Sequence, residues 1–393
     1  MSVDPKALAR HYTRFRVAER VLLTGHSHQA WPDVGFEAQQ QAWLDAAEHV
    51  DDKWDRAFAR ADRVRAGFAR LLDDPGADIA LAASTHDLIV RFLSALPLAR
   101  RPRLVTTDGE FHTVRRQLDR LSEEGIEVVR LPSRPATQIA ERIKKMVTDR
   151  TAAVLVSAVL YENAHIVPNL AVAMDACRRL GVELLVDAYH ALNVVPFSLR
   201  TEQLTDAFIV GGGYKYCQLG EGNAFLRVPK DCALRPVVTG WFSEFAELAK
   251  PPFAGQVPYG EGHARFAGAT YDPTSHYRAA AVFDFFEQQR LDPTALRALS
   301  RHQVELLARE FDALGVDPTV IDRDRRSAPL AAIGGFLSLR APRAGEISRK
   351  LRARNVWTDS RGESLRLGPA PYVTDEQLAA GLAALKEVTA SAL

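Results

Sequence analysis

The sequence predicts an α/β protein in which a large domain, built on a mostly parallel sheet between helices, precedes a smaller α+β domain. Three observations favour this class. Between residues 103 and 228, short apolar runs alternate with amphipathic segments, which is the pattern of a parallel sheet covered on both faces. Beyond residue 272 this alternation stops. The length of 393 residues, 47% of them hydrophobic, allows one large and one smaller core.

The expected elements follow in chain order. Apolar residues at steps of three or four predict helices over 54–72 and 88–96, each burying one face. Short apolar runs predict strands at 103–106, 126–131, 152–156, 182–186, 207–210 and 223–228, the last turning back beside its predecessor. Helices are expected between them at about 114–121, 139–146 and 168–180. In the C-terminal part we expect helices from 277 and 296 and over 346–354 and 374–390, with strands at 330–339 and 364–367.

The order of these segments predicts three parts. Residues 1–50 form an N-terminal segment that packs on the small domain and supplies a lip of the active site. Residues 51–272 form the large domain, and residues 273–393 form a connecting helix and the small domain. Residues 231–272 are rich in proline and glycine, and an irregular stretch of this length is usually functional or lies at an interface.

Composition narrows the classes of partner and compartment. The net charge of +1 gives no reason to expect nucleic acid or an anionic membrane as a partner. The three cysteines, Cys177, Cys217 and Cys232, form no CxxC pair, which favours a reducing compartment. No signal-peptide core is visible in residues 1–20, and the longest apolar run, 152–161, is shorter than the roughly 18 residues of a membrane span. We therefore expect a cytoplasmic protein.

Two of the predicted strands deliver a carboxylate and an amine to one edge of the sheet. One apolar run ends at Asp187, and another ends in three glycines followed by Tyr214 and Lys215. Ligands in open α/β sheets bind beyond the carboxyl ends of the strands. Pyridoxal phosphate chemistry needs this pair, because a lysine binds the cofactor covalently and an aspartate keeps its ring nitrogen protonated. Taken singly, the aspartate reads as a cap and the lysine as a surface amine.

Two other segments carry candidate groups. Ser84 and Thr85 stand where a helix begins, so they suit an N-cap and also a phosphate cradle, and the two roles are compatible. His26 and His28 lie one residue apart in a predicted loop, but no third ligand follows at a metal-binding spacing. We therefore expect no metal site there; the other reading of this loop is a lip of the active site.

Three segments together resemble one known family. They are Ser157-Ala158-Val159-Leu160-Tyr161, Asp187-Ala188-Tyr189-His190 and Gly213-Tyr214-Lys215-Tyr216. They are similar to the class V, fold-type I pyridoxal phosphate enzymes, and within them to kynureninase and its homologues. The resemblance covers nearly the whole chain, and its motifs are specific only when taken together. It implies the fold-type I architecture, in which a seven-stranded sheet in residues 51–272 binds pyridoxal phosphate.

The resemblance implies cofactor-binding roles position by position. Lys215 matches the lysine that binds the cofactor covalently, Tyr214 the tyrosine that reaches its phosphate, and Asp187 the carboxylate under the pyridine nitrogen. Phe111 falls where an aromatic ring stacks on the pyridine, a place that desulfurases fill with His. His190 matches the kynureninase subgroup, whereas desulfurases carry Gln there.

Further roles concern the phosphate, the partner subunit and the substrate. Ser84 and Thr85 match the phosphate-binding turn, and Trp241 matches a tryptophan near the phosphate. Thr270 matches a threonine that reaches the phosphate of the neighbouring subunit, which implies a homodimer with shared active sites. Arg366 matches the arginine that clamps the substrate α-carboxylate, a role that suits its planar fork.

Some positions depart from the family pattern, and all of them lie on the substrate side. The family loop Gly-Asn-Ser-Leu-Gly is replaced by residues 25–29, which place Ser27 and His28 beside the substrate. Kynureninases usually carry Asn where Thr270 stands, and Asn163-Ala164 replaces a typical Thr-Gly. Taken singly, Phe111 and His190 also read as core residues, Arg366 as an ion-pair partner and Trp241 as interface packing. As an ordered set these residues indicate a pyridoxal phosphate enzyme.

The activity implied by the resemblance is hydrolytic Cβ–Cγ cleavage of L-kynurenine or a related aryl-keto amino acid, giving an aromatic acid and alanine. Lys215, with a pKa lowered by burial, would remove the α-proton. The alternatives are a class V aminotransferase or another lyase acting on a different amino acid, and a degenerate, non-catalytic homologue. A cysteine desulfurase is disfavoured because no cysteine follows Cys232. A nucleotide binder is disfavoured because neither GxxxxGK[ST] nor an early GxGxxG is present.

Overall fold

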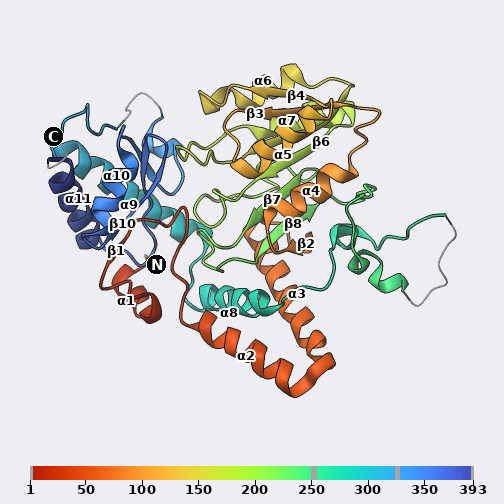
Figure 1. Cartoon of the computed structure of the whole chain (residues 1–393), viewed down its shortest axis with the longest axis horizontal. Coiled ribbons are helices and arrows are strands. Elements are labelled where there is room, and N and C mark those ends of the chain that lie inside the picture. The colour runs from red at the N-terminus through yellow and green to blue at the C-terminus, as the bar shows by residue number, and fades with distance from the viewer. Residues whose placement is uncertain (1–2, 249–254, 324–327, 391–393) are drawn as a thin grey trace.

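A seven-stranded sheet forms the centre of the computed structural model, which describes residues 3–248, 255–323 and 328–390 (Figure 1). The strand order is β2-β8-β7-β6-β5-β3-β4, and β8 alone runs opposite to the others. The strands are β2 (Asp78–Ala82), β3 (Arg103–Thr107), β4 (Glu127–Leu131), β5 (Thr151–Ser157), β6 (Glu183–Asp187), β7 (Phe208–Gly212) and β8 (Ala224–Val228). The predicted α/β class with a mostly parallel sheet is confirmed.

Helices cover both faces of the sheet because successive strand residues point to opposite sides. Leu185 of β6 belongs to the core formed with α4 (Thr85–Ala95) and α5 (His112–Glu123). Its neighbours Leu184 and Val186 belong to the core on the other face. That face is covered by the helices α3 (Lys53–Leu71), α6 (Ile139–Met146) and α7 (Leu170–Leu180). The continuous apolar strands thus follow from burial on both sides.

The C-terminal part forms a separate layered unit, which Figure 1 shows in blue. A small antiparallel sheet has the order β11-β12-β9. Its strands are β9 (Leu337–Arg340), β11 (Asp359–Arg361) and β12 (Ser364–Leu367), and its helices are α9 (Pro293–Ala313), α10 (Ala344–Arg352) and α11 (Asp375–Ala390). The preceding helix α8 (Thr274–Gln288) packs instead against α2 (Val34–His49) and α3 (Figure 1). A further short strand, β10 (Val356–Trp357), lies at its edge.

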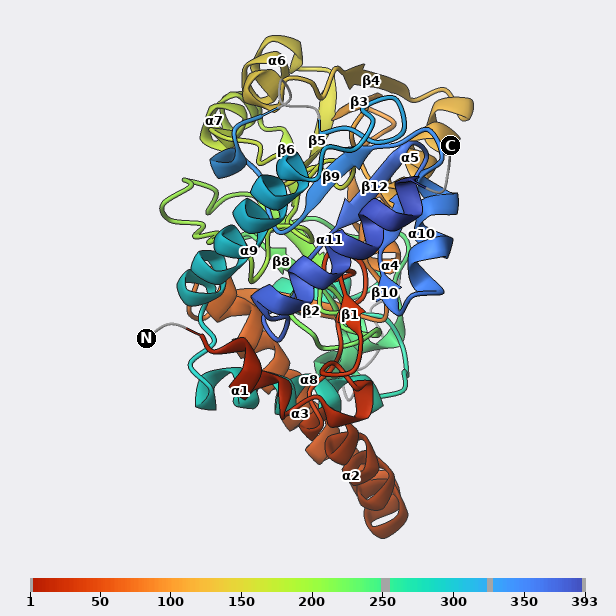
Figure 2. The ribbon, with the colours of Figure 1, turned by 90° about the vertical axis from the view of Figure 1, so that its left-hand side faces the viewer.

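The N-terminal segment is built into this unit. Strand β1 (Val21–Leu22) pairs in parallel with β10, and Figure 2 shows the two side by side next to α11. Within the same segment, helix α1 (Pro5–Ala9) precedes β1 and helix α2 (Val34–His49) follows it. The division at residues 50 and 272 stays a prediction.

The observed elements differ from the expected ones at several places. The strand expected at 330–339 is wrong in its first half, because the Gly334 N–H bonds to the Ala164 carbonyl at 2.7 Å and regular pairing begins only at Leu337. Strands β2, β10 and β11 were not expected, and β2 is alanine-rich rather than β-branched.

The long segment 231–272 contains the 3-10 helices η4 (Trp241–Glu247) and η5 (Gly262–Phe266). Its residues 249–254 lie outside the described part. Within the described ranges no helix is both long and apolar enough to cross a membrane.

Candidate active site

Neighbouring strand ends bring the predicted carboxylate and amine together. Asp187 is the last residue of β6, and in the sheet it lies opposite Ser157 of β5 and Val210 of β7. Lys215 follows three residues after the end of β7. Because β6 and β7 are parallel, both side chains lie at the carboxyl edge of the sheet.

The glycines before Lys215 allow the chain to pass close beneath an aromatic ring. A Cβ atom on Gly212 would lie 2.6 Å from the hydroxyl of Tyr189, and one on Gly213 would lie 2.6 Å from the Cβ atom of Leu219. Neither place admits a side chain. The chain then turns so that the Nζ atom of Lys215 lies 4.5 Å from the centre of the Tyr189 ring.

One narrow cavity collects six of the predicted residues. Thr85, Phe111, Asp187, His190, Tyr214 and Lys215 all line it, together with Thr113, Ser157, Val159, Tyr161 and Tyr189. Lys215 is buried, and its Nζ atom lies 5.2 Å from the centre of the Phe111 ring. An amine, a carboxylate and an aromatic ring thus face a common space.

Burial disfavours the protonated form of Lys215. It lowers the pKa of Lys215 to about 7, although the Asp187 carboxylate acts in the opposite direction. The Nζ atom lies 2.7 Å from Nε2 of His190. Burial, helped by the charge of Lys215, also lowers the pKa of His190 well below its ordinary value. A neutral, nucleophilic amine is therefore accessible at neutral pH.

Asp187 is fixed by its own backbone. One carboxylate oxygen accepts a hydrogen bond from the Tyr189 N–H at 2.8 Å. Burial raises the pKa of Asp187, while this N–H and the Lys215 charge oppose the rise. A cationic group in the cavity would compensate the buried carboxylate.

The first turn of α4 supplies an anion-binding end. Ser84 is the N-cap, as predicted: its hydroxyl accepts a hydrogen bond from the Asp87 N–H, and the Asp87 carboxylate accepts one from the Ser84 N–H. Thr85 is the first residue of the helix and reaches the cavity. Backbone N–H groups and the helix dipole at such an end favour a phosphate.

A buried glutamate behind the cavity was not identified from the sequence. The carboxylate of Glu110 accepts hydrogen bonds from the hydroxyls of Thr107 and Ser157, both at 2.6 Å. Burial raises its pKa to about 7. Glu110 links the ends of β3 and β5 through these hydrogen bonds. Its position directly before Phe111 is the only feature of the sequence that could have indicated a role for it in the site.

The predicted substrate arginine is already paired. Arg366 is buried, its Nη1 atom donates to the Tyr161 carbonyl at 2.6 Å, and its Nη2 atom pairs with the carboxylate of Asp359. Burial lowers the pKa of Arg366, and Asp359 opposes this. His26 lies beside the pair, with its Nε2 atom 3.4 Å from Asp359. Asp359 was not predicted to belong to this site, and in the loop read as a lip of the active site Ser27 and His28, rather than His26, were predicted to meet the substrate.

The other predicted residues lie outside this cavity. Ser27 donates to the Thr24 carbonyl at 3.1 Å, and the exposed His28 ring stacks on Tyr214 at 5.0 Å. Trp241 is 43% exposed, and Thr270 lines a different cavity. The roles assigned to all these residues stay predictions.

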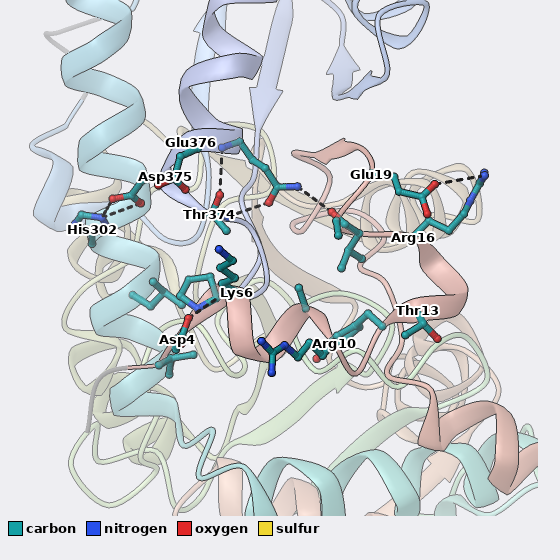
Figure 3. Close-up of a pocket in the computed structure, with 18 of the residues that line it drawn as sticks. Asp4, Lys6, Arg10, Thr13, Arg16, Glu19, His302, Thr374, Asp375 and Glu376 are labelled. Carbon is teal, nitrogen blue, oxygen red and sulfur yellow. Dashed lines mark hydrogen bonds and ion pairs between the residues drawn. The ribbon is translucent and has the colours of Figure 1, made fainter.

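A larger hollow lies elsewhere, between α1, α9 and the start of α11 (Figure 3). Its labelled side chains are mostly charged, and His302 pairs with Asp375 at 2.9 Å on its wall. None of the predicted site residues lines it.

The chain is similar in fold to known pyridoxal phosphate proteins. The structure of a C-DES variant with glycine covalently linked to its pyridoxal phosphate cofactor superposes with a TM-score of 0.83 at 18% identity, over 96% of this chain and 98% of that one. The apo cysteine desulfurase of Thermococcus onnurineus NA1 gives a TM-score of 0.82 at 15% identity, over 100% of both chains. Together these neighbours establish the fold.

Sequence comparison finds one curated relative and no family model. The uncharacterized aminotransferase YcbU of Bacillus subtilis (strain 168) is 26% identical over 344 residues, which is 86% of each protein. No protein-family model matches the chain.

Proposed function

We propose that this protein is a pyridoxal phosphate-dependent enzyme that acts on an amino acid. The observation that carries the proposal is the cavity in which the Lys215 amine, the Asp187 carboxylate and the Phe111 ring meet. The fold neighbours and the curated relative support it, because their names include pyridoxal phosphate and aminotransferase.

The residues present suit the cofactor. Lys215 would bind its aldehyde, Asp187 would face its ring nitrogen, and Phe111 would cover its ring. The phosphate would meet the start of α4 at Ser84 and Thr85. When bound, pyridoxal phosphate supplies an electron-withdrawing ring that stabilises negative charge at the substrate α-carbon.

The chain's own groups would carry the remaining tasks. Arg366 would hold the α-carboxylate of the substrate with its fork of donors. Lys215 would be released when the amino group of the substrate replaces it on the cofactor, and its amine, whose pKa burial lowers to about 7, would then take the α-proton at Nζ. The Asp187 carboxylate would remain ionised as long as a cation faces it.

Aminotransferase or lyase chemistry is the reaction class that the comparisons support best. Kynureninase-like hydrolysis is the second candidate, and the placement of His190 and Phe111 against Lys215 favours it. A persulfide-forming desulfurase would need a cysteine in the small domain, and the sequence has none after Cys232.

We further propose a homodimer with shared sites. Thr270 and Trp241 do not reach the cavity of their own chain, as expected if they serve a partner. Exposed apolar side chains on the same segment, among them Trp241, Phe245 and Leu248, would be covered by that partner. Mixing equal amounts of Lys215→Ala and Thr270→Ala subunits should restore about a quarter of the wild-type activity if sites are shared, because half of the dimers are mixed and each of these has one intact site. No recovery would contradict sharing.

A spectrophotometric screen tests the function. The protein is loaded with pyridoxal phosphate and titrated with single amino acids, including L-kynurenine and 3-hydroxykynurenine, with and without pyruvate or 2-oxoglutarate. A new amino acid product with an oxo acid supports an aminotransferase, whereas release of an anthranilate supports the kynureninase-like reaction. Failure of every amino acid to change the cofactor spectrum would contradict the proposal.

A further inference from the structure

The β11–β12 hairpin places Asp359 directly opposite Arg366. The two residues are cross-strand partners in the antiparallel register, and Arg361 pairs with Ser364 so that only two residues form the turn. The first of these, Gly362, has a φ of +53°, as tight hairpin turns require. The pairing of this carboxylate with this guanidinium is thus fixed by the backbone.

Arg366 has donors to spare but little solvent. It is 3% exposed and packs against the Phe336 ring, with its guanidinium carbon 5.5 Å from the ring centre. In the described part of the chain its Nε atom has no hydrogen-bond partner. An arriving substrate carboxylate would therefore find the positive charge already neutralised by Asp359.

His26 offers Asp359 an alternative partner. Its side chain is fully buried and packs against Phe336, with ring centres 4.4 Å apart. Its Nε2 atom lies 3.4 Å from the same carboxylate oxygen that Arg366 binds, without the alignment of a hydrogen bond. Among the described residues no group bonds to its Nδ1 atom.

The loop of His26 is held firmly against the small domain. The Gly25 N–H donates to the Gly368 carbonyl, and the Gly368 N–H donates to the Leu23 carbonyl, both at 2.8 Å. The imidazole is therefore positioned next to Asp359 by backbone bonds on both sides. A small rotation of the Asp359 side chain would suffice to align the two groups.

We propose that Asp359 occupies Arg366 while the site is empty and yields this place to the substrate carboxylate, whereupon His26 binds the displaced aspartate. The proposal rests on the proposed function, because it needs Arg366 to bind a carboxylate. Asp359 and His26 are then positioning residues that act through Arg366. No proton is transferred in this exchange. The N–H of a neutral His26 donates a hydrogen bond to Asp359, and Arg366 exchanges the Asp359 carboxylate for that of the substrate.

The exchange of Asp359 for the substrate carboxylate at Arg366 would make the site selective for the kind of ligand that it binds. A buried guanidinium without a counter-charge would be costly and would bind any small anion. With Asp359 in place, only a ligand that is held at a second point can displace it. An amino acid meets this condition, because its amino group would replace the Lys215 amine on the cofactor while its carboxylate reaches Arg366.

Binding of L-alanine tests the proposal in the protein loaded with pyridoxal phosphate. Half-saturation is measured from the cofactor absorbance, with L-alaninamide as the ligand that lacks a carboxylate. Asp359→Asn should lower the L-alanine concentration at half-saturation about ten-fold, since Arg366 loses its charged partner and is free to make a charge-assisted hydrogen bond to the ligand. His26→Phe should raise it, and His26→Gln, which keeps a donor, should stay near the wild type. L-alaninamide should change less than about two-fold throughout.

Matched controls separate this proposal from the proposed function. Glu363→Gln removes a charge from the same hairpin turn, on a side chain 66% exposed, and should change nothing. Thermal unfolding shows that each variant folds, and borohydride reduction shows whether the cofactor is attached to Lys215. The proposal is overturned if the cofactor is attached and Asp359→Asn weakens the binding of L-alanine. It is also overturned if the cofactor is attached and neither the wild type nor the Asp359→Asn variant binds L-alanine. If the cofactor is not attached, the proposed function fails first.

Discussion

The Nζ atom of Lys215 lies 2.7 Å from Nε2 of His190, and both side chains are buried. Two basic groups that share such a space cannot both carry a proton at low cost. Burial lowers the pKa of His190 well below its ordinary value and the pKa of Lys215 to about 7, so His190 is neutral at neutral pH and the amine loses its proton as the pH rises through about 7.

The charge state of Lys215 is testable by stability. Burial lowers its pKa from 10.5 to about 7, so between these pH values the unfolded chain binds a proton that the folded apoprotein does not. The contribution of Lys215 to the free energy of unfolding therefore becomes more favourable as the pH rises from about 7 to 10.5. Lys215→Met should stabilise the apoprotein by about 2–5 kcal/mol at pH 6, with little difference left at pH 10.5. Denaturant titrations at several pH values measure this, and a gain independent of pH would contradict it.

For Glu110 we expect the opposite dependence of stability on pH. Burial raises its pKa from 4.5 to about 7, so between these values the folded protein holds a proton that the unfolded chain has lost. Its contribution to stability therefore falls as pH rises through the window. Glu110→Gln should gain about 1–3 kcal/mol relative to wild type between pH 4 and pH 8. Glu123→Gln, on an exposed side chain of α5, serves as the control. Equal pH slopes for wild type and Glu110→Gln would exclude this role.

The Ser84 cap separates folding from cofactor binding. Ser84→Ala removes the capping box of α4 and should lower the free energy of unfolding by about 1 kcal/mol. Ser84→Asn keeps a capping oxygen and should recover most of this loss. If the turn also holds the phosphate, the alanine variant should bind pyridoxal phosphate more weakly in an equilibrium titration. Unchanged stability of the alanine variant would show that the cap contributes little.

Much of the site could be predicted because strand ends are visible in the sequence. Asp187 and Lys215 each follow a buried apolar run, and Ser84 stands at a helix start with an acidic residue three positions later. Their convergence then follows from a parallel sheet alone.

Other parts depend on tertiary contacts that no local pattern encodes. Ser27 and His28 were expected at the substrate, yet His26 is the loop residue that points inward, and an irregular loop has no periodicity from which this could be read. The Asp359–Arg366 pair required the register of a hairpin whose first strand was not expected. Strand β2 was missed because alanine has a low preference for strands.

The most direct test of the central claim is reduction of the pyridoxal phosphate-loaded protein with borohydride, followed by digestion and mass spectrometry. The account predicts that the reduced cofactor is attached to Lys215 and that Lys215→Ala carries no such adduct. Attachment to another of the lysines, or an unmodified Lys215 in a protein that still holds the cofactor and acts on an amino acid, would contradict it.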